Sequence, residues 1–188
     1  MQVYEKRLEI STNVTILKNQ NKTIGFVPTM GALHLGHMAL VKKALAENDV
    51  VVVSIFVNPT QFNNSEDLGN YPRTLDEDVR ILSTVSPEII VFSPSSEEIY
   101  GDSQTSYSYD FGGIEHQMEG KYRPGHFDGV GTVLKHLFTI VSPTRAYFGE
   151  KDFQQVQIVK KLVEIEKMSV TIVAVSYTHL TLPTILLV

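Results

Sequence analysis

TIGFVPTMGALHLGHMALVKKAL, residues 23–45, is the stretch that decides the fold. The apolar run 23–27 predicts a short buried strand, and the apolar residues of 38–45 recur at helical spacing. Two glycines and two histidines therefore lie at a strand-to-helix turn. The first turn of a helix has unpaired N–H groups and the positive end of the helix dipole, and both favour a phosphate. The stretch predicts an anion-binding turn at the end of a strand.

The spacing of the two glycines and the two histidines adds detail to this prediction. Gly31 and Gly36 let the backbone approach a ligand closely or adopt a positive φ. His34 and His37, three residues apart, are expected to face the same anion. Two histidines at this spacing also suit zinc, but no glutamate lies between them and no third ligand is evident, so we assign no metal. The His-x-Gly-His pattern resembles the phosphate-binding signature of nucleotidyl-transferring enzymes related to class I aminoacyl-tRNA synthetases, which implies an ATP site.

Composition sets the broad class of protein. The 188 residues, 43% of them hydrophobic, are enough for one well-buried domain. A net charge of −5 disfavours a nucleic-acid surface, and the absence of cysteine excludes a disulfide framework and a thiolate nucleophile. The first seven residues lack the apolar core of a signal peptide, and no apolar run reaches membrane-spanning length. We expect a cytoplasmic protein with no membrane or nucleic-acid partner.

The rest of the chain alternates between strand and helix patterns. Strands are expected at 49–57, 88–92, 146–148 and 169–175, and helices at 4–20, 74–82, 130–141 and 153–167. The alternating segment 107–111 is expected to be an edge strand, and 120–129 a basic loop rich in glycine. This alternation predicts an α/β fold with a doubly wound parallel sheet and right-handed crossovers.

Polar residues gather in four turns that follow strands, 29–37, 58–61, 123–126 and 149–155. The carboxyl ends of parallel strands meet at one edge of a sheet, so these turns are expected to form one site. Imidazoles and a lysine suit phosphates, a carboxylate suits ribose hydroxyls, and glutamines can both donate to and accept from a small polar substrate. Each of these residues alone is more typical of a solvated loop, and an exposed Lys–Asp pair contributes little energy.

Five motifs carry a resemblance to a known family. They are PTMGALHLGH at 28–37, FVNPTQF at 56–62, YPR at 71–73, RPGHFDGV at 123–130 and YFGEKDFQQ at 147–155. In this order and spacing they resemble pantothenate synthetases, the pantoate–β-alanine ligases. The resemblance extends to about residue 175, and it implies a Rossmann-like fold of the adenylate-forming, HIGH-type nucleotidyltransferase superfamily.

The resemblance also implies a reaction. Pantoate and Mg²⁺-bound ATP would give pantoyl adenylate and pyrophosphate, and β-alanine would then displace AMP to give pantothenate, a coenzyme A precursor. The expected partners are these small molecules, and the protein is expected to form a homodimer.

Site residues follow from the same resemblance. The ATP-binding residues would be Met30, Gly31, Ala32, Leu33, His34, Leu35, Gly36, His37, Gly149, Glu150, Lys151 and Asp152. Catalytic roles fall on His37, His34 and Lys151; His37 matches the family's proton donor, although we expect its role to be mainly electrostatic. Gln61 would bind pantoate and later β-alanine, and Gln155 would bind pantoate.

The sequence departs from the family after residue 175. We expect residues 1–175 to form the ATP- and pantoate-binding domain and 176–188 to be a non-native tail, because 175–184 resembles a translated sequencing adapter. The family's C-terminal lid domain would then be missing, and ligase turnover by this chain would be very low. Two alternatives stay open: a nucleotidyltransferase acting on a phosphorylated acceptor, and a nucleotide-binding fragment without turnover.

Overall fold

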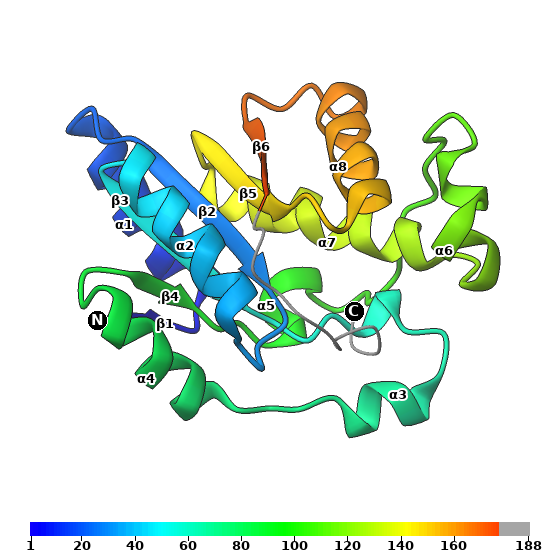
Figure 1. The fold of residues 1–188 in the computed structure, drawn as a ribbon, viewed down its shortest axis with the longest axis horizontal. Coiled ribbons are helices and arrows are strands. Elements are labelled where there is room, and N and C mark those ends of the chain that lie inside the picture. The colour runs from blue at the N-terminus through cyan, green and yellow to red at the C-terminus, as the bar shows by residue number, and fades with distance from the viewer. Residues whose placement is uncertain (177–188) are drawn as a thin grey trace.

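The computed structural model describes residues 1–176, which fold around one six-stranded sheet (Figure 1). Its strands are β1 (Gln2–Tyr4), β2 (Ile24–Thr29), β3 (Val50–Ile55), β4 (Ile90–Phe92), β5 (Arg145–Gly149) and β6 (Thr171–Val175). They lie in the order β1-β4-β3-β2-β5-β6, and every neighbouring pair is parallel. From β2 the chain adds β3 and β4 on one side and later β5 and β6 on the other. The direction of winding therefore switches between β2 and β5, where open α/β sheets bind ligands.

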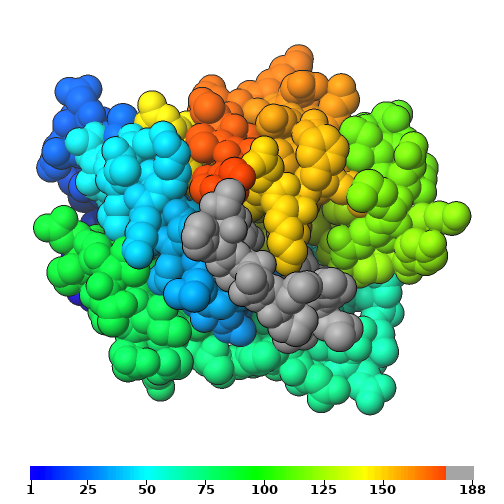
Figure 2. All heavy atoms as spheres, viewed as in Figure 1, coloured from blue at the N-terminus to red at the C-terminus, as the bar shows by residue number. Residues whose placement is uncertain are grey.

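Helices cover both faces of the sheet. They are α1 (Arg7–Asn19), α2 (Leu35–Glu47), α3 (Ser65–Asn70), α4 (Leu75–Val85), α5 (Ser96–Tyr100), α6 (Met118–Tyr122), α7 (His126–Val141) and α8 (Phe153–Ile165), with 3₁₀ turns η1 (Pro59–Gln61) and η2 (Ile114–His116). Helices α2 and α4 pack on one face, and α1, α7 and α8 on the other. Figure 2 shows the segment containing η2 and α6, in yellow-green, against the orange α8 at one end of the molecule. The predicted doubly wound α/β class is confirmed.

The sequence of β3 explains why the core has two halves. Val52 packs into the cluster beneath α7 and α8, whereas its neighbours Val51 and Val53 pack beneath α2 on the opposite face. Successive side chains of a strand point to opposite faces, so a continuous apolar run fills both halves of the core.

The predicted edge strand at 107–111 is wrong. Its alternation is real, but the backbone N–H groups of Tyr107 and Tyr109 donate to side-chain oxygens of Thr132 and Asp128 on α7, each at 2.9 Å. The segment is therefore an extended strap across a helix, because side-chain acceptors take the hydrogen bonds that a strand partner would supply. The edges of the sheet are β1 and β6 instead.

Several predicted boundaries also shift. The helix expected from residue 4 begins at Arg7, since β1 pairs with β4 through Tyr4. The expected loop 120–129 contains the end of α6 and the start of α7. Strand β6 ends at Val175, and the domain boundary expected there stays a prediction, because most of the expected tail, 177–188, lies outside the described residues. No helix within residues 1–176 is long and apolar enough to cross a membrane.

Candidate functional site

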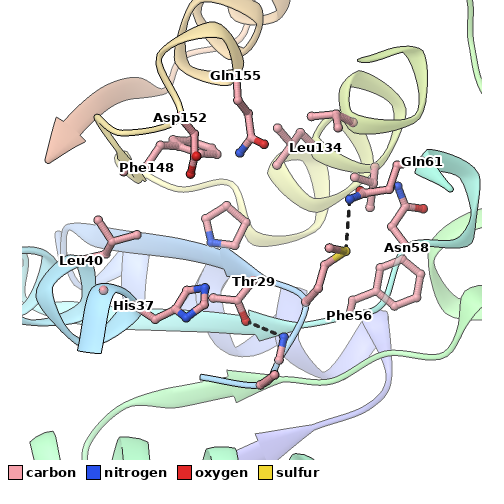
Figure 3. Close-up of a pocket in the computed structure, with 18 of the residues that line it drawn as sticks. Thr29, His37, Leu40, Phe56, Asn58, Gln61, Leu134, Phe148, Asp152 and Gln155 are labelled. Atoms are coloured by element: carbon pink, nitrogen blue, oxygen red, sulfur yellow. Dashed lines mark hydrogen bonds between the residues drawn. The ribbon is translucent and has the colours of Figure 1, made fainter. Parts of the chain in front are cut away.

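A cleft of about 260 Å³ opens where the winding direction switches, at the carboxyl ends of β2 and β5 (Figure 3). The turn after β2 and the start of α2 form one wall. The turn after β5 and the start of α8 form the opposite wall, and η1 and α7 close the end between them. Three of the four turns predicted to converge line the cleft, whereas the turn at 123–126 does not line it and instead contacts the backbone carbonyl of Gln61.

Most of the predicted site residues line this cleft. They are Met30, Gly31, Ala32, His34, Gly36, His37, Gln61, Gly149, Lys151, Asp152 and Gln155. Three others do not line it. Leu33 packs in the core beneath α2, the Leu35 side chain is 76% exposed, and the exposed Glu150 uses its backbone N–H to bond Val175.

The loop between β2 and α2 is held by a carboxylate that sequence analysis missed. Asp78 on α4 is 1% exposed, and its two oxygens accept hydrogen bonds from the backbone N–H groups of Ala32 (3.1 Å) and Leu33 (2.7 Å). Gly31 has a φ of +86°, and a Cβ at that position would lie 3.0 Å from the same carboxylate. The loop therefore needs a glycine for both its conformation and its close approach to Asp78.

We expect Asp78→Asn to weaken ATP binding. The new amide group turns a donor toward one of the two loop N–H groups, which leaves that buried N–H without an acceptor. A loosened loop should raise the ATP dissociation constant by roughly tenfold, measured by calorimetry. Asp76→Asn, an exposed site on the same helix, is the matched control. Unchanged ATP affinity in Asp78→Asn would show that the carboxylate does not support the site.

The two histidines form a cap at the start of α2. The backbone N–H of Gly36 donates to Nδ1 of His34 at 3.1 Å, and the backbone N–H of His34 donates to Nδ1 of His37 at 3.3 Å. Their ring centroids are 4.1 Å apart. Since each Nδ1 accepts a hydrogen bond, the proton of each neutral ring lies on Nε2. The cap thus leaves both Nε2–H groups as donors.

Burial keeps these rings neutral. Desolvation, with a smaller contribution from His34, lowers the pKa of His37 to about 4. Desolvation first, and then the nearby Lys151, also lowers the pKa of His34. At neutral pH both rings are therefore uncharged hydrogen-bond donors that lie beside the positive end of the α2 dipole.

The low pKa of His37 predicts acid sensitivity. Between pH 6.5 and 4 the unfolded chain binds a proton on His37 that the native chain does not, so the free energy of unfolding falls as the pH falls. His37 should account for about 3 kcal/mol of this loss. Urea unfolding of the wild type and of His37→Gln across this range isolates the contribution, and parallel curves would contradict it.

The opposite wall carries Lys151, Asp152 and Gln155. Burial raises the pKa of Asp152, and the lysine beside it opposes that shift. The neighbouring Gln154 turns away from the cleft: its Nε2 donates to the backbone carbonyls of Ile114 and Gln117. Of the two adjacent glutamines, one holds η2 and α6 in place and Gln155 alone reaches the cleft (Figure 3).

Gln61 lies at the far end of the cleft and is only 8% exposed. Its backbone carbonyl accepts from His126 Nδ1 at 3.0 Å and from the Arg123 guanidinium at 3.3 Å. Helix α7 also touches this turn directly, because a Cβ on Gly129 would lie 2.4 Å from the Thr60 carbonyl oxygen. The turn that carries Gln61 is therefore packed against α7 without free space.

An apolar wall is the second feature that sequence analysis missed. Four residues of α7 line the cleft together with Phe56 and Phe148, and they are Val130, Val133, Leu134 and Leu137. Their spacing of three and four residues marks one helical face, which was a usable signal. It was hidden because α7 carries four further apolar residues, Phe127, Phe138, Ile140 and Val141, which pack in the core. The wall suits a ligand with a branched hydrocarbon part.

Among residues 1–176, no group of three or more histidine, aspartate or glutamate side chains is arranged to hold a metal ion.

Comparisons with known proteins point to one family. Residues 2–179 match the family model described as pantoate-beta-alanine ligase. The pantothenate synthetase of Flavobacterium psychrophilum is 57% identical over 173 residues, which are 92% of this chain and 61% of that protein. The pantoate-beta-alanine ligase of Francisella tularensis, solved in complex with β,γ-ATP and β-alanine, has a TM-score of 0.90 at 43% identity over 96% of this chain and 68% of that one.

A more distant structure shows the fold alone. The tyrosyl-tRNA synthetase of Leishmania major has a TM-score of 0.53 at 12% identity, covering 87% of this chain and 31% of that one. This agrees with the predicted HIGH-type nucleotidyltransferase fold. The chain spans about 61% of the length of the curated relatives from Flavobacterium psychrophilum and Christiangramia forsetii. With the family model matching nearly all of it, the chain belongs to the pantoate-beta-alanine ligase family.

Proposed function

We propose that this chain is the ATP- and pantoate-binding part of a pantoate–β-alanine ligase. One observation carries the proposal. A single cleft combines a helix N-terminus capped by two histidines with two glutamines and an apolar wall. The capped helix N-terminus suits the phosphates of ATP. The two glutamines and the apolar wall suit a small branched hydroxy acid such as pantoate.

The chemistry begins with the carboxylate of pantoate, which attacks the α-phosphorus of ATP and releases pyrophosphate. The amine of β-alanine then attacks the acyl carbon of pantoyl adenylate, and AMP leaves. Both steps need the reactants to be aligned and the phosphate charge to be stabilised. Met30–Gly36 and Gly149–Asp152 would bind the nucleotide, with Lys151 on the phosphates and Asp152 on the ribose, and Mg²⁺ would enter with ATP.

The histidines would act as neutral donors. His34 and His37 would direct their Nε2–H groups toward a phosphate. The low pKa of His37 keeps its ring neutral at neutral pH, so this role does not use an imidazolium acid. Gln61 would hold pantoate and later β-alanine, and Gln155 would hold pantoate. The homodimer implied by the family stays a prediction, to be measured by sedimentation.

Pyrophosphate release tests the proposal. The assay uses a chimera in which residues 1–175 are followed by the C-terminal part of a pantothenate synthetase relative, because this chain spans only part of such proteins. Release that depends on pantoate supports the ligase. Release only with a phosphorylated acceptor supports a nucleotidyltransferase, and ATP binding without adenylate formation supports a nucleotide-binding fragment.

Gln61→Ala should weaken the binding of pantoate far more than the binding of ATP. The change removes a buried amide from the end of the cleft away from the histidines, so a polar group of pantoate loses its partner. We expect the pantoate dissociation constant to rise by roughly tenfold or more while ATP affinity stays within about twofold, measured by calorimetry. Equal losses for both ligands would count against the assignment.

A further inference from the structure

The side-chain amide of Gln61 has one defined orientation in the cleft. Its Oε1 accepts a hydrogen bond from Nδ2 of Asn58 at 3.0 Å, and its Nε2 lies 3.1 Å from Sδ of Met30, a cleft residue (Figure 3). With its oxygen turned toward Asn58, the amide presents its Nε2 N–H groups to the cleft, where Met30 accepts one of them.

The orientation of Asn58 is set by groups that cannot exchange roles. Its Oδ1 accepts from the backbone N–H of Thr60, which can only donate, and its Nδ2 donates to the carbonyl of Gly129 at 3.2 Å, which can only accept. Asn58 is 1% exposed, so water does not compete for these bonds. With Nδ2 facing Gln61, the Gln61 amide must turn its oxygen toward Asn58.

Tyr100, at the end of α5, supplies a further donor to the same oxygen. Its hydroxyl donates to Oδ1 of Asn58 and lies 3.1 Å from Oγ1 of Thr60. Burial raises the pKa of Tyr100 to about 12, so the hydroxyl keeps its proton at neutral pH. Its ring packs against Phe56, with centroids 6.3 Å apart, but Tyr100 itself does not line the cleft.

We propose that Tyr100 is a positioning residue that acts through Asn58 to keep the Gln61 amide group pointed into the cleft, where it selects a carboxylate or hydroxyl oxygen of pantoate. This inference rests on the proposed function and deepens it. It assigns a role to a residue from a separate helix, 42 positions from Asn58 in the sequence.

Tyr100→Phe is the first test, because it removes the hydroxyl and keeps the ring. In the 188-residue chain we expect the pantoate dissociation constant to rise by roughly fivefold to tenfold, with ATP affinity within about twofold. Asn58→Asp should act more strongly. Its carboxylate would accept from the Gln61 amide group, turn the Gln61 oxygen into the cleft, and weaken pantoate binding by about fiftyfold or more.

Tyr109→Phe is the matched control. Its hydroxyl bonds Glu166 at 3.1 Å and does not line the cleft, so both affinities should stay unchanged. Unchanged pantoate affinity in Tyr100→Phe would overturn the proposal. Equal losses of pantoate and ATP affinity with a lower melting temperature would also overturn it, because they indicate a merely structural role.

Side-chain amide NMR signals test the positioning role of Tyr100 independently of the proposed function. Without any ligand, Tyr100→Phe should shift the Asn58 and Gln61 amide signals, whereas Tyr109→Phe should not. If the wild type binds no pantoate, the proposed function fails, and these signals still decide the positioning claim. Unshifted signals would overturn it.

Discussion

His37→Ala should lower the rate of pantoyl adenylate formation by roughly a hundredfold, the scale for losing one preorganised donor to transition-state charge. His37 lies at the start of α2, with Nδ1 bonded to the His34 backbone and Nε2–H left for a ligand. The alanine removes the donor and one half of the histidine cap, while the Asp78 carboxylate that holds the loop remains. Pantoate-dependent pyrophosphate release by the chimera measures the rate.

The control for this change is His116→Ala. His116 lies in η2 with its side chain 82% exposed, and it does not line the cleft, so its loss should leave the rate unchanged. An unchanged rate in His37→Ala would show that the histidine cap does not contribute to the phosphate site. A rate that falls in the wild type as the pH rises from 6 to 8 would instead favour an imidazolium acid over the neutral donor.

Gly129→Val should destabilise the fold and abolish pantoate binding. Any Cβ at this position meets the backbone of η1, at 2.4 Å from the Thr60 oxygen and 2.7 Å from Gln61 Cα. Backbone atoms cannot move aside as a flexible side chain can, so either α7 or the turn that carries Gln61 must shift. We expect a loss of about 3 kcal/mol and a melting temperature lower by roughly 6–12 °C, measured by calorimetry.

Gly69→Val is the matched control, because a Cβ on Gly69 in α3 meets nothing within 4 Å. That variant should bind pantoate as the wild type does. If Gly129→Val keeps both its melting temperature and its pantoate affinity, the contact between α7 and η1 does not position Gln61.

The sequence predicted the fold class because its signals were local and strong. The continuous apolar run of β3 and the periodicity of α2 and α8 each arise within one element. The edge strand at 107–111 failed for a non-local reason. Alternation shows that a segment has one buried face, but it does not show whether a sheet or, as here, α7 covers that face.

The residues of the site also differ in whether their surroundings are local in the sequence. Gly31, His34 and His37 belong to one turn whose chemistry can be read from adjacent residues. Asp78 could not be found in this way, since the acidic first turn of α4 looks like ordinary helix-dipole compensation and its contact with Leu33 spans 45 residues. The support of Gln61 by Asn58, Tyr100 and Gly129 likewise needed three elements in place.

The central claim is that pantoate's carboxylate attacks ATP in this cleft, and isotope transfer tests it most directly. Pantoate labelled with ¹⁸O in its carboxylate is incubated with ATP, β-alanine and the chimera, and the AMP formed is analysed by mass spectrometry. In the proposed reaction one carboxylate oxygen bonds to the α-phosphorus and stays there when β-alanine breaks the acyl C–O bond. The account predicts AMP carrying one ¹⁸O atom, and AMP formed together with pantothenate but without ¹⁸O would contradict it.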